Sequence, residues 1–440
     1  MNSQSSRYIA EYQSLDVELP GQNLSWLTQL RIDSLAQFAE QGFPSSSAEE
    51  WRYTNFSAIE KKIFIPSSKN DIPEINNAAL ATYRLEDCYS LVLLDGQFVA
   101  ELSELFGMPD NVQLCSISTA LQQFPDEVAE YFGKTVANED HGFIHFNTAW
   151  FTDGWFLKLP ENTVLDKPIQ ILNVVSENEL MVTTRNLIIV EQNAQVEIVE
   201  SYFGLDADTY LTESINEVFI GQNARVNLAK LQNETDKAFH FGGTYVQQER
   251  DAYFYHESFS FGSQIARNEI HTNLGQGSEC HLNGLYLGAK RQIVDNHTRI
   301  NHLQPNAISR ETYKGILSQR ARGVFQGRVI VYEDAQKTDS EMNNRNLLLS
   351  DDAEADTKPQ LEIYADDVKC AHGVTVGQLD DKSIFYLQTR NIDPETAKNM
   401  LTFAFANEMV EKISLENLHT QVLDLLLLRF PQMGIPKEWM

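Results

Sequence analysis

Cysteine is scarce in this chain of 440 residues. Only four cysteines are present, and no two of them form a C-x-x-C pair. Four cysteines in a chain of this length are too few for the disulfide framework that is typical of small secreted domains. We therefore expect a reducing compartment and a cytoplasmic location. The four are Cys88, Cys115, Cys280 and Cys370.

Basic residues are also few. The chain has 34 Lys and Arg against 62 Asp and Glu, which gives a net charge of −28 at pH 7. A surface this acidic repels the phosphates of nucleic acids and the headgroups of anionic membranes. We therefore expect neither nucleic acid nor a membrane among the partners. Acidity alone does not indicate metal binding, because most of these carboxylates belong on a solvated surface.

Long hydrophobic runs are missing as well. The longest, Leu425 to Leu428, is far shorter than the roughly 20 residues of a membrane-spanning helix. Met1 to Ala10 lacks the basic and then apolar region of a secretion signal. Aromatic residues are plentiful, with 24 Phe, 16 Tyr and 5 Trp, so the chain can form a large core. Its length predicts two or three domains or one elongated repeat.

Residues 1–138 predict a helical and mixed α/β region. Apolar residues at three-to-five-residue steps predict a helix within 20–60, and Gly42-Phe43-Pro44 ends it. Ser45 to Glu50 has the composition of a second helix start. Leu91 to Leu94, followed by Asp95-Gly96, predicts a strand and a turn. Leu121 to Phe132 predicts a short helix.

The sequence predicts that residues 139–390 form a β-rich central region, the core of the protein. Between about 140 and 388, short β-branched or aromatic runs alternate with Gly, Asn and Asp turns. The segment EQNAQVEI at 191–198 resembles GQNARVNL at 221–228, and GQGSECHL at 275–282 is a weaker copy. Spacings of 30 residues and of about twice 27 are typical of a stacked solenoid. A large sandwich predicts similar strands, but the repeat favours a parallel β-helix. In it, Val, Ile and Leu would stack inward, and Asn or Gly would form the corners.

Residues 391–440 predict a helical domain. Asp393-Pro394-Glu395 combines a capping residue, a first-turn proline and a first-turn acid. A second helix should follow from about Leu415 to Phe430, with Pro431 after its end. The two helices either pack on the rest of the chain or are offered to a partner, and the sequence leaves both open. The apolar face expected of the first comprises Met400, Phe403, Ala404, Val410 and Ile413.

Several motifs of catalysis and nucleotide binding do not occur. Gly133-Lys134-Thr135 resembles the end of a phosphate-binding loop, but Val128 stands where that loop needs its first glycine. There is no G-x-G-x-x-G after a strand, no G-x-S-x-G and no H-E-x-x-H. We therefore expect no nucleotide on this chain and no catalytic residues of its own.

Histidines cluster in the expected core, at spacings that fit no single ligand set. We interpret them as residues hydrogen-bonded within the strand ladder. They are His240, His256, His271, His281, His297 and His302.

Cys370 and His372 differ from the other candidates. They lie two residues apart in a run with strand character, Val368 to Val376, so both side chains should point to one face. A thiolate and an imidazole are good ligands for iron, zinc or copper. Two ligands do not complete a tetrahedral site, so the others would come from elsewhere in the chain or from another chain. The alternatives are a thiol activated by the histidine, or a small buried cysteine beside a hydrogen-bonded histidine.

Longer motifs around this pair resemble the SufB/SufD family of iron–sulfur cluster assembly proteins. The similarity is dense from about 295 to 410. The chain lacks the cysteine-rich N-terminal motif of SufB and is shorter, so it is more similar to the SufD branch. Ala371 departs from the serine that is frequent in relatives. The motifs are PQLEIYADDVKCAHG at 359–373, SRETYKGI at 309–316, GVFQGR at 323–328, NRNLLLS at 344–350 and EEWRYT at 49–54.

The resemblance implies a right-handed β-helix core between an N-terminal helical part and a C-terminal helical domain. It implies a scaffold that pairs with SufB, or with itself when SufB is absent, and that binds the ATPase SufC through the C-terminal helices. A desulfurase would act indirectly. A transient iron–sulfur cluster would form at the interface with SufB, with His372 as the stronger ligand and Cys370 as the weaker one. ATPase and desulfurase activity would belong to the partners.

Two alternatives stay open from the sequence. The chain could be a purely structural adaptor in which Cys370 and His372 have no ligand role. It could also be a β-helix enzyme acting on carbohydrates, which would need a cleft with clustered acidic and basic residues and usually a secretion signal.

Overall fold

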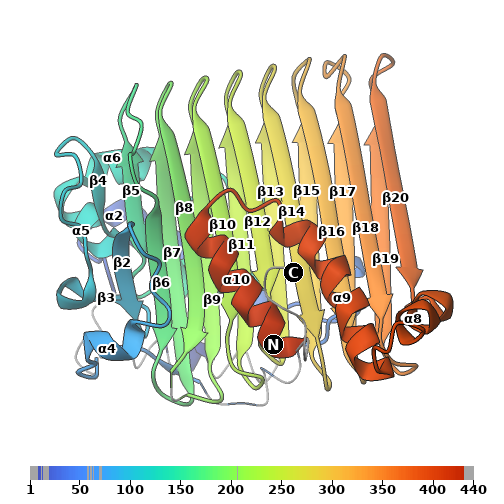
Figure 1. The fold of residues 1–440 in the computed structure, drawn as a ribbon. Helices are drawn as coiled ribbons and strands as arrows, with labels where there is room; N and C mark the ends of the chain where they lie inside the picture. The colour runs from blue at the N-terminus through green and yellow to red at the C-terminus, as the bar shows by residue number, and fades with distance from the viewer. Residues whose placement is uncertain are drawn as a thin grey trace.

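The computed structural model describes residues 19–56, 64–68, 72–205 and 207–430, together with residues 8–10, 12, 59 and 62. The chain forms a parallel β-solenoid of about 8 turns with helices at both ends of the sequence, 41% strand and 23% helix (Figure 1). The mainly β, parallel β-helix architecture predicted from the repeat is therefore confirmed.

One of the two sheets, sheet A, lies behind the other in Figure 1. Its short strand β4 is antiparallel to β5, and all its later pairings are parallel. The two-residue strand β1 (Ile65–Pro66) pairs with β7 at its side. The strands in spatial order are β4 (Gln113–Ser116), β5 (Trp155–Leu159), β7 (Leu180–Val190), β9 (Leu211–Ile220), β11 (Phe239–Gln248), β13 (Ile265–Leu274), β15 (Ile293–His302), β17 (Arg322–Val331) and β19 (Glu354–Ile363).

Sheet B faces the viewer in Figure 1. The strand predicted at 91–94 lies in this sheet as β2, which pairs in parallel with β6. The strands in spatial order are β3 (Gln97–Phe98), β2 (Tyr89–Leu94), β6 (Ile169–Val175), β8 (Gln195–Gly204), β10 (Arg225–Asn233), β12 (Tyr253–Ser260), β14 (Glu279–Gly288), β16 (Ile308–Leu317), β18 (Asp339–Leu348) and β20 (Lys369–Gly377).

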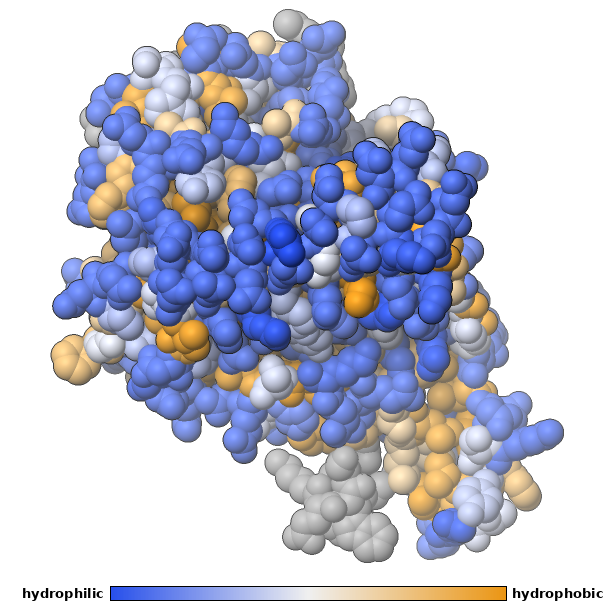
Figure 2. Space-filling model, turned by 90° about the horizontal axis from the view of Figure 1, so that it is seen from above, coloured by the Kyte–Doolittle hydropathy of each residue, from blue (hydrophilic) through white to orange (hydrophobic). Residues whose placement is uncertain are grey.

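The sequence repeat marks one row of corners, where each sheet A strand passes into the next sheet B strand. Asn193, Asn223 and Gly277 all have positive φ there, and Asp251 occupies the same position in the turn between the last two. The side-chain amide of Asn223 donates to Asn193 Oδ1 at 2.8 Å. The corner role predicted for Asn and Gly is confirmed. Viewed from above, the surface that includes this row is largely hydrophilic (Figure 2).

The interior between the sheets changes character along each strand. The first inward positions are apolar, such as Val226 and Leu228 of β10, and belong to one continuous core. The next inward positions are polar and buried, such as Lys230 and Gln232 of the same strand. Lys230 Nζ donates to Asn268 Oδ1 at 2.8 Å, and burial lowers the pKa of this amine to about 8. The solenoid therefore contains a polar zone beside its apolar core.

The N-terminal helices cover the first turns of the solenoid and the outer face of sheet A. The predicted first helix is α2 (Ser25–Gln41), which ends at Gly42 with φ +66°. The expected single helix at 121–132 is wrong, because Pro125 starts a new helix: the segment forms α5 (Ile117–Gln123) and α6 (Pro125–Tyr131). The predicted helix start at Ser45 leads only to the 3-10 turn η1 (Glu49–Trp51).

Three other short helices were not expected from the sequence. The segment 142–150 forms α7 (Gly142–Trp150), in which every residue except His145 is buried, so no amphipathic period distinguishes it from a strand. The helix α8 (Asp381–Gln388) follows the last strand, and none of its residues is buried. The third is α4 (Asn77–Leu80).

The C-terminal helices are α9 (Pro394–Val410) and α10 (Glu416–Arg429). Asp393 caps α9 as predicted, accepting from the amides of Glu395 and Thr396 at 3.0 Å. Phe403 and Val410 are buried, but Ala404 is exposed. Both helices pack through one face on the outer side of sheet B (Figure 1). Pro431 lies outside the described residues. No helix in the described part of the chain is long and apolar enough to cross a membrane.

The EEWRYT segment is fastened to sheet A by a buried cation. Arg267 of β13 pairs with Glu269 at 2.6 Å and with Asp295 at 2.9 Å, and all three side chains are almost fully buried. Arg267 also donates to the carbonyl of Glu50 at 3.0 Å, and its guanidinium lies 3.5 Å from the ring centre of Trp51. One arginine therefore joins the N-terminal region to two rungs of the solenoid.

Replacing this arginine should strongly destabilise the fold. Arg267→Ala leaves two buried carboxylates without their cation, a change that typically costs about 3–5 kcal/mol. The measurement is the free energy of unfolding in urea. The control is Arg320→Ala, which removes an exposed pair with Asp352 at 3.4 Å and should cost about 1 kcal/mol or less. Equal losses in the two variants would contradict the role of Arg267.

Candidate functional site

The two ends of the solenoid differ. At the N-terminal end, the antiparallel strands β3 and β4 and their loops cover the interior, with Phe98, Leu105 and Met108 packed on the core. At the other end, β19 and β20 are the last strands of their sheets. Val374 and Val376, at inward positions of β20, are 39% and 44% exposed. The second end is therefore open and partly apolar, as expected of an interaction surface.

Cys370 and His372 lie on β20 at this open end. Ser340 is the register partner of Cys370, and Met342 is that of His372. Ser340 and Met342 are buried and point into the solenoid, so Cys370 and His372 point inward as well. This confirms that the pair shares one face of a strand. His372 is exposed because no further strand follows β20 among the described residues.

The thiol of Cys370 is half-buried against the end of the core. Burial raises its pKa, the carboxylate of Asp339 adds to this, and the backbone amide of Ser340 acts in the opposite direction. The thiol is therefore protonated at neutral pH and would lose its proton on binding a metal ion.

The pair forms at most half of a metal site. No group of three His, Cys, Asp or Glu side chains that could hold a metal ion occurs within the described residues. Asp366 and Asp367, the nearest carboxylates in the sequence, precede the strand at its corner, and Asp367 pairs with Lys337. A thiolate and an imidazole still fit iron chemically. Any further ligands must therefore come from outside the described part of the chain.

Five of the six core histidines are paired within the solenoid, as the sequence interpretation predicted, and the sixth has no such pairing among the described residues. Each of five contacts a carboxylate or a hydroxyl: His240 and Glu234 at 2.8 Å, His271 and Glu139 at 3.1 Å, His281 and Glu279 at 3.6 Å, His297 and Asp295 at 3.0 Å, and His302 and Ser309 at 2.9 Å. The sixth, His256, is buried, and burial lowers its pKa to about 3.

The segment that resembles a phosphate-binding loop has a structural role instead. The amides of Gly133 and Thr135 donate to the buried carboxylate of Glu217 at 2.7 and 3.1 Å. Glu217 in turn pairs with Arg185 at 2.7 Å. The backbone donors that would bind a phosphate are therefore already used by the protein itself.

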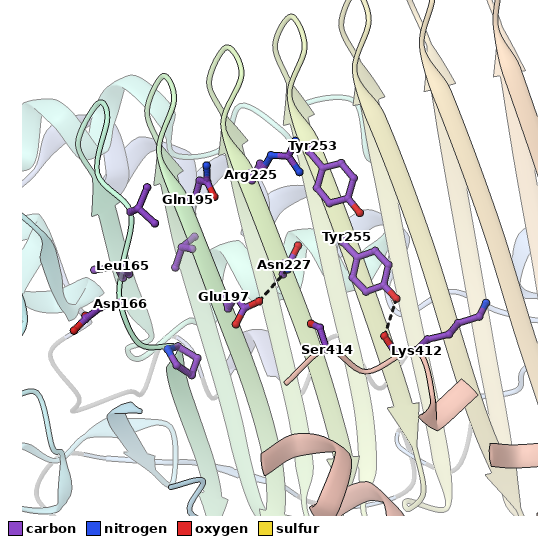
Figure 3. A pocket seen from close by; sticks show the side chains of 13 residues that line it. Leu165, Asp166, Gln195, Glu197, Arg225, Asn227, Tyr253, Tyr255, Lys412 and Ser414 are labelled. Carbon is purple, nitrogen blue, oxygen red and sulfur yellow. Dashed lines mark hydrogen bonds between the residues drawn. The ribbon is translucent and has the colours of Figure 1, made fainter. Parts of the chain in front are cut away.

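A groove on sheet B is a second candidate site, which sequence reasoning missed (Figure 3). It has a volume of about 530 Å³ and lies between the outer face of β8, β10 and β12 and the connection from α9 to α10. The guanidinium of Arg225 lies 5.1 Å from the ring centre of Tyr253, and Tyr255 donates to the carbonyl of Lys412 at 3.4 Å. The groove is thus the edge of the contact between the C-terminal helices and the solenoid.

The same contact contains two lysines, Lys314 on sheet B beneath α9 and Lys412 in the connection from α9 to α10. Lys314 of β16 donates to the carbonyl of Phe405 at 3.0 Å and pairs with Glu408. Lys412 donates to Asn283 of β14 at 3.0 Å. Polar contacts of this kind can separate at lower cost than an apolar core, so the helices are attached through a partly polar interface.

Glu311 lies inside the solenoid, two rungs before His372 in the same inward column. It is fully buried, and neither carboxyl oxygen has a hydrogen-bond partner among the described residues by geometric criteria. Burial raises its pKa from 4.5 to about 8, with Thr298 acting slightly in the opposite direction. A carboxyl group whose pKa is raised on folding destabilises the fold increasingly as the pH rises between the two values.

Glu311→Gln should therefore stabilise the protein more at pH 8 than at pH 5. One pKa unit corresponds to about 1.4 kcal/mol, so the gain at pH 8 is on the order of 4 kcal/mol. Thermal midpoints of both proteins across this range measure it. Glu341→Gln, on the exposed outer face of β18, is the control and should show no such trend. A gain that does not vary with pH would contradict a buried, protonated Glu311.

Sequence reasoning missed that the open end exposes the solenoid interior. Ile363 at the end of β19, Tyr364 directly after it and Phe385 of α8 are 41%, 63% and 66% exposed, around the same end. The sequence contained part of this information, because Val374 and Val376 occupy every second position after Cys370 and His372 and therefore share their face of the strand. Only the structure shows that no further rung of the described residues covers these positions.

Comparison with known proteins gives matches over nearly the whole chain. The family model described as SUF system FeS cluster assembly, SufBD core domain, matches residues 173–405. The model described as SufBD protein N-terminal region matches residues 2–171.

Individual relatives agree with the family models. An iron–sulfur cluster assembly SufBD family protein of Synechocystis is 32% identical over 389 residues, which is 85% of each chain. The iron–sulfur cluster assembly protein SufD of Escherichia coli is 30% identical over 88% of this chain and 90% of its own length. The Bacillus subtilis protein of the same name is 27% identical over 92% and 94%.

Proposed function

Since the chain belongs to the SufB/SufD family of iron–sulfur cluster assembly proteins, we propose that it is the SufD-type scaffold subunit of a complex with SufB and SufC. In this proposal the chain catalyses no reaction itself, acts in the cytoplasm, and receives sulfur indirectly from a desulfurase. The observation that carries the proposal is the Cys370 and His372 pair at the open end of the solenoid.

The open end is the proposed SufB-binding surface. Its last strands have unpaired edges, and its inward valines are exposed, so a second solenoid can continue the stack and cover them. SufB shares the family and is the partner expected from the SufD relatives. A second copy of this chain could occupy the same surface when SufB is absent.

The cluster would form where the two solenoids meet. His372 is exposed and Cys370 is half-buried beside it, so a partner covering the end would bring its own ligands to both. An iron–sulfur cluster here is a product assembled and passed on, and a half-site on each chain makes release possible when the two chains separate. His372 is the stronger ligand in this proposal because its side chain is exposed at the end of its column.

The C-terminal helices are the proposed contact with SufC. One face of α10 packs on sheet B, while Leu428 on another face is 78% exposed. In Figure 2 a part of the molecule projects at the lower right, and hydrophobic side chains gather at its base. Figure 1 places α8 and α9 on this side. ATP-driven closure of SufC would pull on helices held by the polar contacts of Lys314 and Lys412, and would transmit force to the strands that lead to the open end.

His372→Ala should abolish cluster formation while assembly with SufC persists. The experiment is anaerobic iron and sulfide reconstitution of the purified complex, followed by its visible absorption. His372 is exposed, so its loss should leave the thermal midpoint unchanged. His145→Ala, on α7 away from both the open end and the C-terminal helices, is the matched control.

Unchanged cluster formation in His372→Ala would contradict the ligand role. It would leave the alternative of a structural adaptor, in which the pair only completes the end of the core. Cys370→Ser should have a smaller effect, because Cys370 is the weaker ligand.

Leu428→Glu should reduce co-purification of SufC about tenfold or more, as expected when a charge enters an apolar contact. The control is Val164→Glu, an aliphatic residue of similar exposure, 60%, in a loop of the solenoid. Equal recovery of SufC with both variants would contradict the assignment of this helix face.

A further inference from the structure

A chain of buried hydroxyl groups ends directly behind Cys370. The inward positions of the last sheet B strands stack in register, with Ser309 of β16 below Ser340 of β18 and Ser340 below Cys370 of β20. Ser309 Oγ donates to Ser340 Oγ at 2.8 Å. Both serines are almost fully buried, at 1% and 3% exposure. Polar side chains at such positions are costly unless their hydrogen bonds are used.

The start of this chain is His302, at the end of β15. Its Nε2 lies 2.9 Å from Ser309 Oγ, and it is fully buried. Burial lowers its pKa to about 4, so the ring is neutral and carries one N–H. Ser309 gives its hydrogen to Ser340, and in that orientation the N–H of His302 lies on Nε2 and points to Ser309, while Nδ1 faces Thr338 Oγ1 at 3.4 Å. The three donors are therefore aligned in one direction, toward the open end.

The last donor of this chain is uncommitted. Ser340 Oγ accepts from Ser309, and its own hydrogen has no acceptor among the described residues. The next side chain in the column is that of Cys370, whose sulfur already accepts from the backbone amide of Ser340, while the hydroxyl of Ser340 makes no hydrogen bond to the sulfur in this structure. Donors aligned in a chain polarise one another, so the last hydroxyl is a stronger donor than an isolated serine.

We propose that Ser340, oriented by Ser309 and His302, is a positioning residue that donates a hydrogen bond to the metal-bound sulfur of Cys370. This inference rests on the proposed function, because it assigns the support of that same ligand. Hydrogen bonds to ligand sulfur tune metal affinity and electronic structure in thiolate sites. Ser340 therefore holds the Cys370 sulfur in place at the open end of the solenoid and lowers the energy of the lone pairs on that sulfur.

The test is cobalt(II) titration of the full-length chain, monitored through the sulfur-to-cobalt charge-transfer band. Loss of the band in Cys370→Ser assigns it to this thiol rather than to Cys88 or Cys115. Ser340→Ala should shift the band to lower energy and weaken cobalt binding about three- to tenfold, the typical effect of one hydrogen bond. Ser340→Thr, which keeps the hydroxyl, should restore both properties. Ser309→Ala should give a smaller shift in the same direction.

Each outcome bears on the inference. A Cys370 band that is identical in the wild-type chain and in Ser340→Ala would overturn the role of Ser340 and leave the proposed ligand role standing. The absence of any cobalt–thiolate band from the wild-type chain would overturn this inference alone, because reconstitution of the complex with His372→Ala tests the proposed function separately. A shift that Ser340→Thr fails to reverse would show a packing effect, and would also overturn the hydrogen-bond role.

Discussion

The structure depends on the in-register parallel stacking of strands. Each residue of a rung lies above the residue one turn earlier, so side chains of like character form columns and the backbone bonds continue from turn to turn. Stacking of this kind has no natural end, because every rung leaves the next set of donors and acceptors unpaired. The chain covers the first rung with its own N-terminal strands and loops, and no further strand of the described residues covers the last rung. The open end thus follows directly from the way the fold is stabilised.

The same constraint explains the polar interior. Columns that contain Lys230, Glu311 or Ser309 bury groups that must be satisfied or neutralised. Lys230 bonds to Asn268, Glu311 is protonated at neutral pH, and the serines bond to one another. Each side chain in a column also restricts the conformations of the next one, because the two pack directly against each other. Cys370 and His372 are the last members of two such columns, and this gives a surface pair the support of a buried core.

Much of the fold could be predicted because its signals are local. The corner residues Asn193 and Asn223 repeat at one turn, and Asp393-Pro394 marks a helix start by backbone chemistry alone. Predictions failed where local patterns were ambiguous. The almost fully buried helix α7 has no amphipathic period, and the helix expected at 121–132 contains a proline that starts a second helix. The contact of α9 and α10 with sheet B was left open, since an apolar helix face does not identify the surface it will cover.

For the candidate site, the sequence by itself determined the residue types, their shared face and, through long motifs, the family. It could not determine that Cys370 and His372 lie at the open end, because exposure depends on whether another rung follows. Nor could it determine that Ser340 lies behind the thiol, since that depends on the register between strands 30 residues apart. Spacing along one strand is fixed by covalent geometry, whereas the neighbours of a strand are chosen only when the turns stack.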